Sequence, residues 1–326
     1  MAKRRMRRGA ALGVILLLGG LLAACALPAP PPLVVAAPQV QGEPRLSGRL
    51  VFVVSGDIWQ WEDGQVQQLT SGERFEGPAW SPDGTRLVAS LVGVNHSDLV
   101  LLSPDGQLLR RLTDNRGQRR IQDADWARLP AWSPDGERIA YASDVRTYDL
   151  ALWSIAPDGS APRQLFQAGD YGGGVDRPTW APSGTELAVA AFRRGEVSQI
   201  EIVTPATGRY RAVTQAPNGA YDPAWSPDGE WIAYVARDGA RHDIWLVHPD
   251  GTGAVQVTST GRNRMPAWSP DGRWLAFFTL AENGFDLRVL PVPEEGPSAP
   301  AEGRVLVSGR TIEGPSGLSW GPPRPE

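Results

Sequence analysis

Short apolar segments separated by turn residues follow one another along most of the chain, and the stretch around Trp225 shows the pattern most clearly. Pro227-Asp228-Gly229 and Pro249-Asp250-Gly251 are its turn residues. Proline presets the first corner of a tight turn, aspartate accepts a backbone hydrogen bond, and glycine takes a positive φ without steric cost. The pattern predicts a four-stranded antiparallel unit, with strands A to D over 221–225, 231–235, 243–247 and 254–258.

The same unit recurs along the chain. Near-identical copies of Pro-Ala-Trp-Ser-Pro-Asp-Gly begin at Pro78, Pro130, Pro223 and Pro266, with a looser copy over 178–184 and a worn one over 318–322. The tryptophans of these copies are 43 to 52 residues apart, at Trp80, Trp132, Trp180, Trp225, Trp268 and Trp320. Four strands per unit, a signature tryptophan and a period of this size are typical of β-propeller blades around a central channel.

The two ends of the repeat region complete each other. The first unit has strand B after Ser47, strand C over 57–61 and strand D over 66–70, but no strand A precedes it. The chain ends with 317–322, a strand A that nothing follows. We therefore predict an all-β fold, a six-bladed β-propeller closed by one C-terminal strand that joins three N-terminal strands. Closure of this kind removes exposed sheet edges.

One position of strand B is small or short in every copy. It follows the first apolar residue of the strand and is occupied by Val51, Val88, Ala140, Ala188, Ala233 and Ala276. We expect small side chains at this position because neighbouring blades pack closely near the axis of a propeller.

These residues resemble the PD40, or TolB-like, propeller repeat family, whose repeat reads much as Pro-x-Trp-Ser-Pro-Asp-Gly followed by Ile-Ala-aromatic. The resemblance covers residues 48–322 and implies the propeller fold. It is distinct from WD40 repeats, because the Gly-His and Trp-Asp signatures are missing. The full TolB protein has a small α/β domain before its propeller, and a proline-rich segment occupies that position here.

The N-terminal residues have the pattern of an export signal. Basic residues at Lys3, Arg4, Arg5, Arg7 and Arg8 precede an apolar run from Ala10 to Ala24, which is too short to favour a membrane-spanning helix. The run ends in Leu22-Ala23-Ala24-Cys25, which resembles a bacterial lipobox, whose cysteine is lipidated when the leader is cut. Cys25 is the only cysteine, and the alternatives are an incidental thiol or a twin-arginine signal.

We accordingly divide the chain into a lipoprotein signal peptide (1–24), a tether rich in proline and alanine (25–47), the propeller (48–322) and a short tail (323–326). A segment of the tether's composition is extended, semi-rigid and buries little. The predicted mature protein is an exported monomer, lipid-anchored to the cell membrane or the outer membrane and facing the periplasm or the exterior.

Removing the leader takes away five basic residues and no acidic ones, so the formal charge falls from −4 to −9. An acidic protein lacks the clustered positive charge that nucleic acids and anionic membrane surfaces require. We therefore expect neither to be a partner of the propeller, and the membrane to be reached only through the lipid at Cys25.

Variable loops are the best candidates for a binding site. In a propeller the A–B and C–D turns lie on one face and the B–C and D–A loops on the other, and here the second set is long and varied. The D–A loop 114–128 combines arginine with tryptophan, which is typical of binding anchors, and 169–177 is rich in glycine. The predicted binding residues are Arg74, Glu76, Arg116, Trp126, Arg128, Tyr148, Tyr171, Asp176, Arg177, Tyr221, Asp222, Arg264 and Phe285. The alternative is that these loops are simply solvated, with internal salt bridges.

Four patterns that resemble chemistry have plainer explanations. The repeat tryptophans are expected in the core rather than on a sugar platform, and one aspartate per turn supplies too few oxygens for calcium. The segment 317–321 matches Gly-x-Ser-x-Gly, but no histidine follows it. His242 and His248 flank one predicted strand at opposite ends, so no metal triad is expected. We predict no catalytic residue, no metal and no cofactor.

The residues favour a non-enzymatic, lipid-anchored binding or scaffold protein outside the cytoplasm. Its loop face or channel is expected to hold an envelope protein, a peptide or an envelope polymer. Two other classes remain open. A propeller hydrolase or lyase would gather acidic residues such as Asp176 and Asp222 at the channel mouth, and a sensory ectodomain would need a signalling partner encoded elsewhere.

Overall fold

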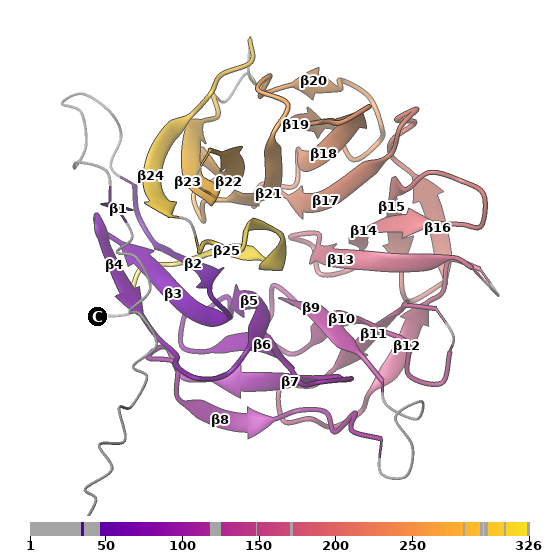
Figure 1. Ribbon diagram of the computed structural model, residues 1–326. Coiled ribbons are helices and arrows are strands. Elements are labelled where there is room, and N and C mark those ends of the chain that lie inside the picture. The colour runs from indigo at the N-terminus through magenta and orange to yellow at the C-terminus, as the bar shows by residue number, and fades with distance from the viewer. Residues whose placement is uncertain are drawn as a thin grey trace, which may run out of the picture. The chain divides into compact units, whose positions relative to one another are not determined.

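The computed structural model describes residues 34–35, 46–117, 125–147, 149–169, 172–282, 284–293, 296, 299–309 and 311–324. The described regular structure is almost entirely β, and it forms six antiparallel sheets within the compact unit 31–326. Contacts between the first strands of successive sheets close a ring, in which the third sheet lies opposite the sixth. Figure 1 shows the sheets arranged around a common centre, as predicted for a propeller.

Five blades follow the chain in order. Blade one contains β5 (Phe75–Trp80), β6 (Leu87–Val92), β7 (Ser97–Leu102) and β8 (Leu108–Arg111). Blade two contains β9 (Ala127–Trp132), β10 (Ile139–Ser143), β11 (Ala151–Ile155) and β12 (Arg163–Phe166). Blade three contains β13 (Gly174–Trp180), β14 (Leu187–Phe192), β15 (Gln199–Thr204) and β16 (Arg209–Ala212). Blade four contains β17 (Ala220–Trp225), β18 (Ile232–Asp238), β19 (Arg241–Val247) and β20 (Val255–Gln256). Blade five contains β21 (Asn263–Trp268), β22 (Trp274–Ala281), β23 (Gly284–Pro291) and β24 (Arg304–Gly309).

Blade six joins the two ends of the chain. Its innermost strand is β25 (Leu318–Gly321), which is followed outward by β2 (Arg49–Val54), β3 (Asp57–Glu62) and β4 (Gln65–Gln68). The register runs from Arg49 opposite Gly321 to Phe52 opposite Leu318. The predicted closure by one C-terminal strand and three N-terminal strands is therefore confirmed.

A buried arginine holds this closure together. Arg49 is 1% exposed, and its guanidinium donates hydrogen bonds to the carbonyl oxygens of Pro322 (2.9 Å) and Gly84 (2.6 Å). It also lies 3.8 Å from the ring centroid of Trp80 in blade one. One contact is to Pro322, directly after the C-terminal strand, and two are to blade one. Arg49 therefore links the N-terminal strand of the closing blade both to the end of the chain and to the neighbouring blade.

The turns after strand A have the chemistry that the sequence predicts. In blade four the Ser226 hydroxyl contacts Asp228 Oδ1 (2.5 Å) and accepts a hydrogen bond from the Trp231 N–H (2.9 Å). Asp228 also accepts from the Glu230 N–H, and Gly229 has φ +84°. The same serine–aspartate contact occurs in blades one, two and five, at Ser81, Ser133 and Ser269. Blade three has Ala181 at this position, so its turn lacks the buried hydroxyl.

A second repeated contact ties strand D to strand C. In blade four the Ile244 N–H donates to Thr258 Oγ1 (2.9 Å), and this hydroxyl lies 3.2 Å from Asp243 Oδ1. Ile58, Leu99 and Ile200 donate in the same way to threonines at the ends of their own D segments, which are Thr70, Thr113 and Thr214. In each case the threonine lies after the last residue of the short strand D. Its hydroxyl accepts the hydrogen bond of a strand C backbone N–H that strand D no longer reaches.

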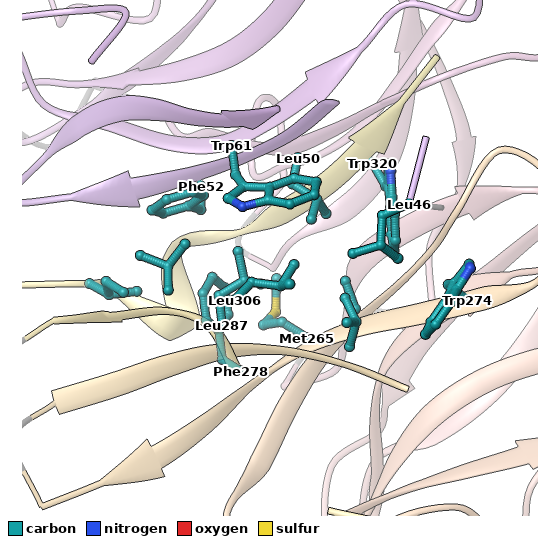
Figure 2. Close-up of a cluster of buried hydrophobic side chains, with 14 of the residues drawn as sticks. Leu46, Leu50, Phe52, Trp61, Met265, Trp274, Phe278, Leu287, Leu306 and Trp320 are labelled. Carbon is teal, nitrogen blue, oxygen red and sulfur yellow. The ribbon is translucent and has the colours of Figure 1, made fainter. Parts of the chain in front are cut away.

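The hydrophobic core lies between adjacent blades. Figure 2 shows one such interface, where Leu50, Phe52 and Trp61 of blade six face Leu287, Leu306 and Phe278 of blade five. Trp80, Trp132, Trp268 and Trp320 are buried, while Trp180 and Trp225 are half-buried and pack against the core clusters, so the predicted place of the repeat tryptophans in the core holds fully for four of the six. All six small strand B positions are 0% exposed, as their size predicts.

One strand was not predicted. Val34–Val35 form β1, which pairs antiparallel with β24 as the fifth strand of the blade five sheet. β1 lies beside β24 in Figure 1. These two valines belong to the segment that composition describes as a tether burying little, so part of that segment is bound to the propeller.

We predict that Ser226→Ala lowers the free energy of unfolding by about 1 kcal/mol, because it leaves the part-buried backbone N–H of Trp231 without its acceptor. Ser183→Ala is the control for loss of an exposed turn hydroxyl, since Ser183 takes the place of the turn aspartate in blade three and its hydroxyl contacts that of Thr185. Denaturant unfolding of both variants measures the difference. Equal losses would show that the serine is not a special element of the turn.

Candidate functional site

The six innermost strands line a central cavity of about 480 Å³. Prolines form much of its wall, including Pro78, Pro130, Pro178, Pro223 and Pro266, and Trp80, Trp225, Trp268 and Trp320 also line it. The wall is therefore largely apolar, and its charged lining residues are Arg177 and Asp222. Both lie in the middle of strand A, directly before its proline, at the end of the lining that is nearer the loop face; we call this end the channel mouth.

The backbone at the channel mouth has the same irregularity in blades one to five. Strand A of blades one to five contains a β-bulge next to strand B. Its residue before the proline has a positive φ, at Gly77, Leu129, Arg177, Asp222 and Met265, and Gly317 holds the corresponding place in blade six. Bulges re-aim side chains, and non-glycine residues with positive φ cluster at functional sites. The bulges thus build a ring of varied residues around the channel.

Arg177 crosses this ring. Its Nε lies 2.7 Å from Asp222 Oδ1 of blade four, and its Nη2 donates to the Pro315 carbonyl oxygen of blade six, also at 2.7 Å. Asp222 Oδ2 accepts from the Met265 N–H of blade five (3.3 Å). Because blade three lies opposite blade six, the Arg177 side chain spans the mouth. Figure 1 shows the segment before β25 at the centre of the ring, close to β13.

Further charged side chains surround this pair. Arg128 Nη2 of blade two donates to Glu76 Oε2 of blade one (3.1 Å), while Arg128 Nε is buried without a hydrogen-bond partner among the described residues. Arg264 Nη2 lies 3.3 Å from His242 Nε2. Burial lowers the pKa of His242, and the cations of Arg264 and Arg237 lower it further. Neutral His242 can accept the hydrogen bond of Arg264.

Asp176 has the most perturbed carboxyl of the mouth. Burial raises the pKa of Asp176 above its usual value, and the nearby Asp222 carboxylate adds to this shift. The guanidinium groups of Arg177 and Arg128 oppose this shift, and so does the backbone N–H of Arg177, which donates to Asp176 Oδ1 (3.0 Å). A half-buried carboxyl whose protonation responds to nearby charges is typical of binding and catalytic sites.

The structure brings six of the predicted binding residues together at the mouth, namely Glu76, Arg128, Asp176, Arg177, Asp222 and Arg264. Tyr221 directly precedes Asp222 and packs partly against the core between blades four and five. Arg74 is exposed, and Phe285 packs edge-on against Phe278 at 6.3 Å. Arg74 and Phe285 therefore do not belong to the charged group at the mouth.

The remaining predicted residues lie elsewhere or are not described. Arg116 is exposed and pairs with Asp114 (3.3 Å), which is the internal salt bridge of the solvated-loop alternative. Trp126 is half-buried, and its N–H donates to Asp144 Oδ1 (2.7 Å). Tyr148, Tyr171 and Cys25 lie outside the described residues.

Sequence reasoning missed Leu129, Met265 and His242 as members of the site. The first two occupy the position before the proline in the repeat, which is glycine, leucine, arginine, aspartate or methionine in different copies. The variation at this one position, directly before a motif that is otherwise constant, is the sequence feature that could have indicated a site. From the sequence, His242 is weighed only as a metal ligand, whereas in the structure its Nε2 contacts Arg264 Nη2.

The described residues bear on two sequence patterns, the metal site and the Gly-x-Ser-x-Gly match. They contain no group of three or more histidine, cysteine, aspartate and glutamate side chains placed to hold a metal ion. Ser319 of the Gly-x-Ser-x-Gly match lies within β25, where its Oγ accepts from the Trp80 N–H (3.3 Å), so it does not occupy a strand-to-helix turn. No helix in the described part of the chain has the length and apolar character needed to cross a membrane.

Comparison with known proteins places the repeat in a family. The sequence profile of PD40, described as TolB beta propeller domain, matches residues 128–316. The crystal structure of TolB from Acinetobacter baumannii superposes with a TM-score of 0.67 at 18% identity, covering 85% of this chain and 67% of that one. At this identity the likeness concerns the fold alone.

Two curated relatives share part of the chain. An uncharacterized peptidase of Bacillus subtilis (strain 168), YuxL, is 25% identical over 227 residues, which are 56% of this chain and 33% of that protein. The Tol-Pal system protein TolB of Anaeromyxobacter dehalogenans (strain 2CP-C) is 34% identical over 88 residues, which are 25% of this chain and 18% of that protein. The chain thus spans a third or less of the length of these relatives.

We predict that Asp176→Asn raises the thermal stability at neutral pH, because it removes the penalty for burying a charged carboxylate. The folded pKa of Asp176 lies above its ordinary value, so the wild-type gains stability as the pH falls through the folded pKa towards the unfolded one, about 4. The advantage of the variant should therefore shrink to nothing below about pH 4.

Thermal melts of wild-type and Asp176→Asn at neutral and acid pH test whether the variant is the more stable protein at neutral pH. Asp158→Asn is the control, because hydrogen bonds from Ser160 lower the pKa of the exposed Asp158 and predict the opposite sign. An Asp176→Asn variant that is less stable than wild-type at neutral pH would show that charge pairing outweighs burial at this carboxyl.

Proposed function

Since the chain belongs to the PD40 family of TolB β-propeller domains, we propose that it is an exported, lipid-anchored binding or scaffold protein whose channel mouth holds an envelope protein, a peptide or an envelope polymer. The observation that carries the proposal is the convergence of charged side chains from five blades on the rim of a largely apolar cavity. A concave apolar site with a few convergent polar groups is the usual form of a binding site.

The rim suits an extended or protruding partner. Arg177 and Asp222 satisfy each other in the free protein, and Arg177 also covers the entrance by its bond to Pro315. Arg264 contacts His242 and forms no salt bridge within the described residues. A partner that inserts a segment into the mouth would meet an apolar wall below and both cations and carboxylates around it, which favours a polypeptide or polymer carrying mixed charge.

Export and anchoring rest on the sequence of the leader. The basic start, the apolar run and Cys25 after Leu22-Ala23-Ala24 support a lipidated N-terminus outside the cytoplasm. The name TolB in several relatives supports a role in the cell envelope. Metabolic labelling with a radioactive fatty acid tests the anchor, since Cys25→Ser should abolish incorporation.

A second candidate function is catalysis at the same mouth. The observation that favours it is the raised pKa of Asp176 beside the Asp222 carboxylate. Two acidic groups with different environments are a common acid–base arrangement, and one relative is named a peptidase. Turnover of a peptide or glycoside that Asp176→Asn abolishes, with the fold intact, would favour an enzyme over a binding protein.

We predict that Arg264→Ala and Asp222→Ala each weaken partner binding by about tenfold or more, the effect expected of a residue at an interface centre. The full-length protein, solubilised in mild detergent, is used to capture components of its own envelope, and affinity for the captured component is then measured directly. Asp250→Ala on the turn face is the control and should bind as wild-type does.

Which of these variants loses binding shows on which face of the propeller the partner binds. Loss of binding with Asp250→Ala and normal binding with the two mouth variants would place the partner on the turn face and overturn the proposal.

A further inference from the structure

We propose that the outer edge of β24 is a docking surface whose occupant is the chain's own Val34–Val35, and that this pairing shortens the connection between the propeller and its lipid anchor. The pairing aligns Val34 with Ser308 and Val35 with Val307. It extends blade five to five strands, whereas the other blades end at their fourth strand within the described residues.

The edge of β24 differs from the other outer edges. β24 has six residues, and its Leu306 and Val307 are 5% and 0% exposed. The outer strands β4, β8, β12 and β16 have four residues each and β20 has two, and β8 and β16 are exposed along their whole length. A long apolar edge exposes unpaired backbone groups and invites pairing with another strand. β24 is therefore the blade edge that most needs an occupant.

The tether supplies a segment of matching length and chemistry. Leu33-Val34-Val35 is its most apolar run with β-branched residues, and prolines stand on both sides at Pro32 and Pro38. β-branched residues favour strands, while proline cannot donate to a ladder. The sequence thus permits a short strand at this point and limits its length.

A second contact fixes the other end of the tether. Leu46 is 3% exposed and belongs to the core cluster between blades five and six, together with Leu306 and Val307. Figure 2 shows Leu46 in that interface, with Leu306 in the same cluster. The chain is therefore held to the propeller at 34–35 and again at Leu46, on the same pair of blades.

The pairing changes the reach of the anchor, and this step rests on the lipidation of Cys25 proposed above. Val34 lies nine positions after Cys25, and nine chain steps span at most about 30 Å. If β1 were released, the first fixed residue would be Leu46, which lies 21 positions after Cys25, and 21 chain steps span up to about 70 Å. The docked tether thus holds the outer edge of blade five close to the bilayer. The channel mouth lies on a different part of the propeller, at the inner strands.

We predict that Val34→Cys and Ser308→Cys form a disulfide within one chain, because directly paired residues of antiparallel strands lie within disulfide reach. The full-length chain carries Cys25→Ser, which leaves no native thiol. Val34→Cys with Arg211→Cys, on the exposed outer strand of blade three, is the control. The first pair should close on the order of tenfold faster than the control.

The cross-link has two outcomes that contradict the docking. Equal rates for the two pairs would mean that the tether has no preferred edge. A disulfide that forms between two chains and depends on protein concentration would mean that a second copy, rather than the same chain, occupies β24.

The reach is tested on the lipidated protein bound to vesicles of phosphatidylethanolamine and phosphatidylglycerol. A donor dye on Glu302→Cys, next to β24, reports energy transfer to an acceptor lipid. Val34→Pro/Val35→Pro removes both N–H groups and should lower the transfer, while Val34→Thr/Val35→Thr keeps them and should leave it unchanged. Equal transfer in the two variants would overturn the shortened reach.

These measurements separate the two proposals. An intrachain cross-link in the Cys25→Ser chain, together with a chain that keeps Cys25 but does not remain on the vesicles, would overturn the lipid anchor and leave the docking supported. A chain that remains on the vesicles but shows no preferred cross-link would overturn the docking and leave the anchor supported.

Discussion

The pairing of β25 with β2 is the contact on which the rest of the structure depends. It joins residues more than 260 positions apart and converts a row of blades into a ring. Arg49 strengthens the junction, because it is buried between the C-terminal strand and blade one and bonds to carbonyl oxygens of both. Burial lowers the pKa of Arg49, yet its cation still satisfies these oxygens and lies over Trp80. Each blade can then pack on two neighbours.

Closure also explains the strained backbone at the channel mouth. A residue before proline normally takes an extended conformation, but Leu129 and Met265 have φ values of 52° and 57°. Each such residue costs about 1–3 kcal/mol and persists only where its surroundings determine it. The ring supplies that constraint, since six inner strands must converge without closing the channel. The strained position is also where the side chains of Arg177 and Asp222 point at the cavity.

The repeat predicted most of the fold, because its signals are local. The turn residues, the strand tryptophans and the half-repeats at the two ends determined the blades, their order and their closure. Charged residues of the site were also found, since they lie just before a constant motif. The bulges, the Arg177 bond to Pro315 and the Arg264 contact with His242 were not, because each depends on which blades lie opposite or adjacent in the ring. β1 was missed because two valines between prolines carry too little local signal.

The two surfaces that depart from the repeat place different demands on the propeller. The channel mouth needs rigid inner strands, because its charged groups from several blades must keep their spacing to recognise a partner. The edge of β24 needs only a free row of backbone groups, and a two-residue strand can leave it without disturbing the interblade core. A bound partner and a docked tether therefore use separate parts of the molecule. The closed ring fixes the geometry of the channel mouth, whereas β1 can bind to or leave the edge of β24 without changing that geometry.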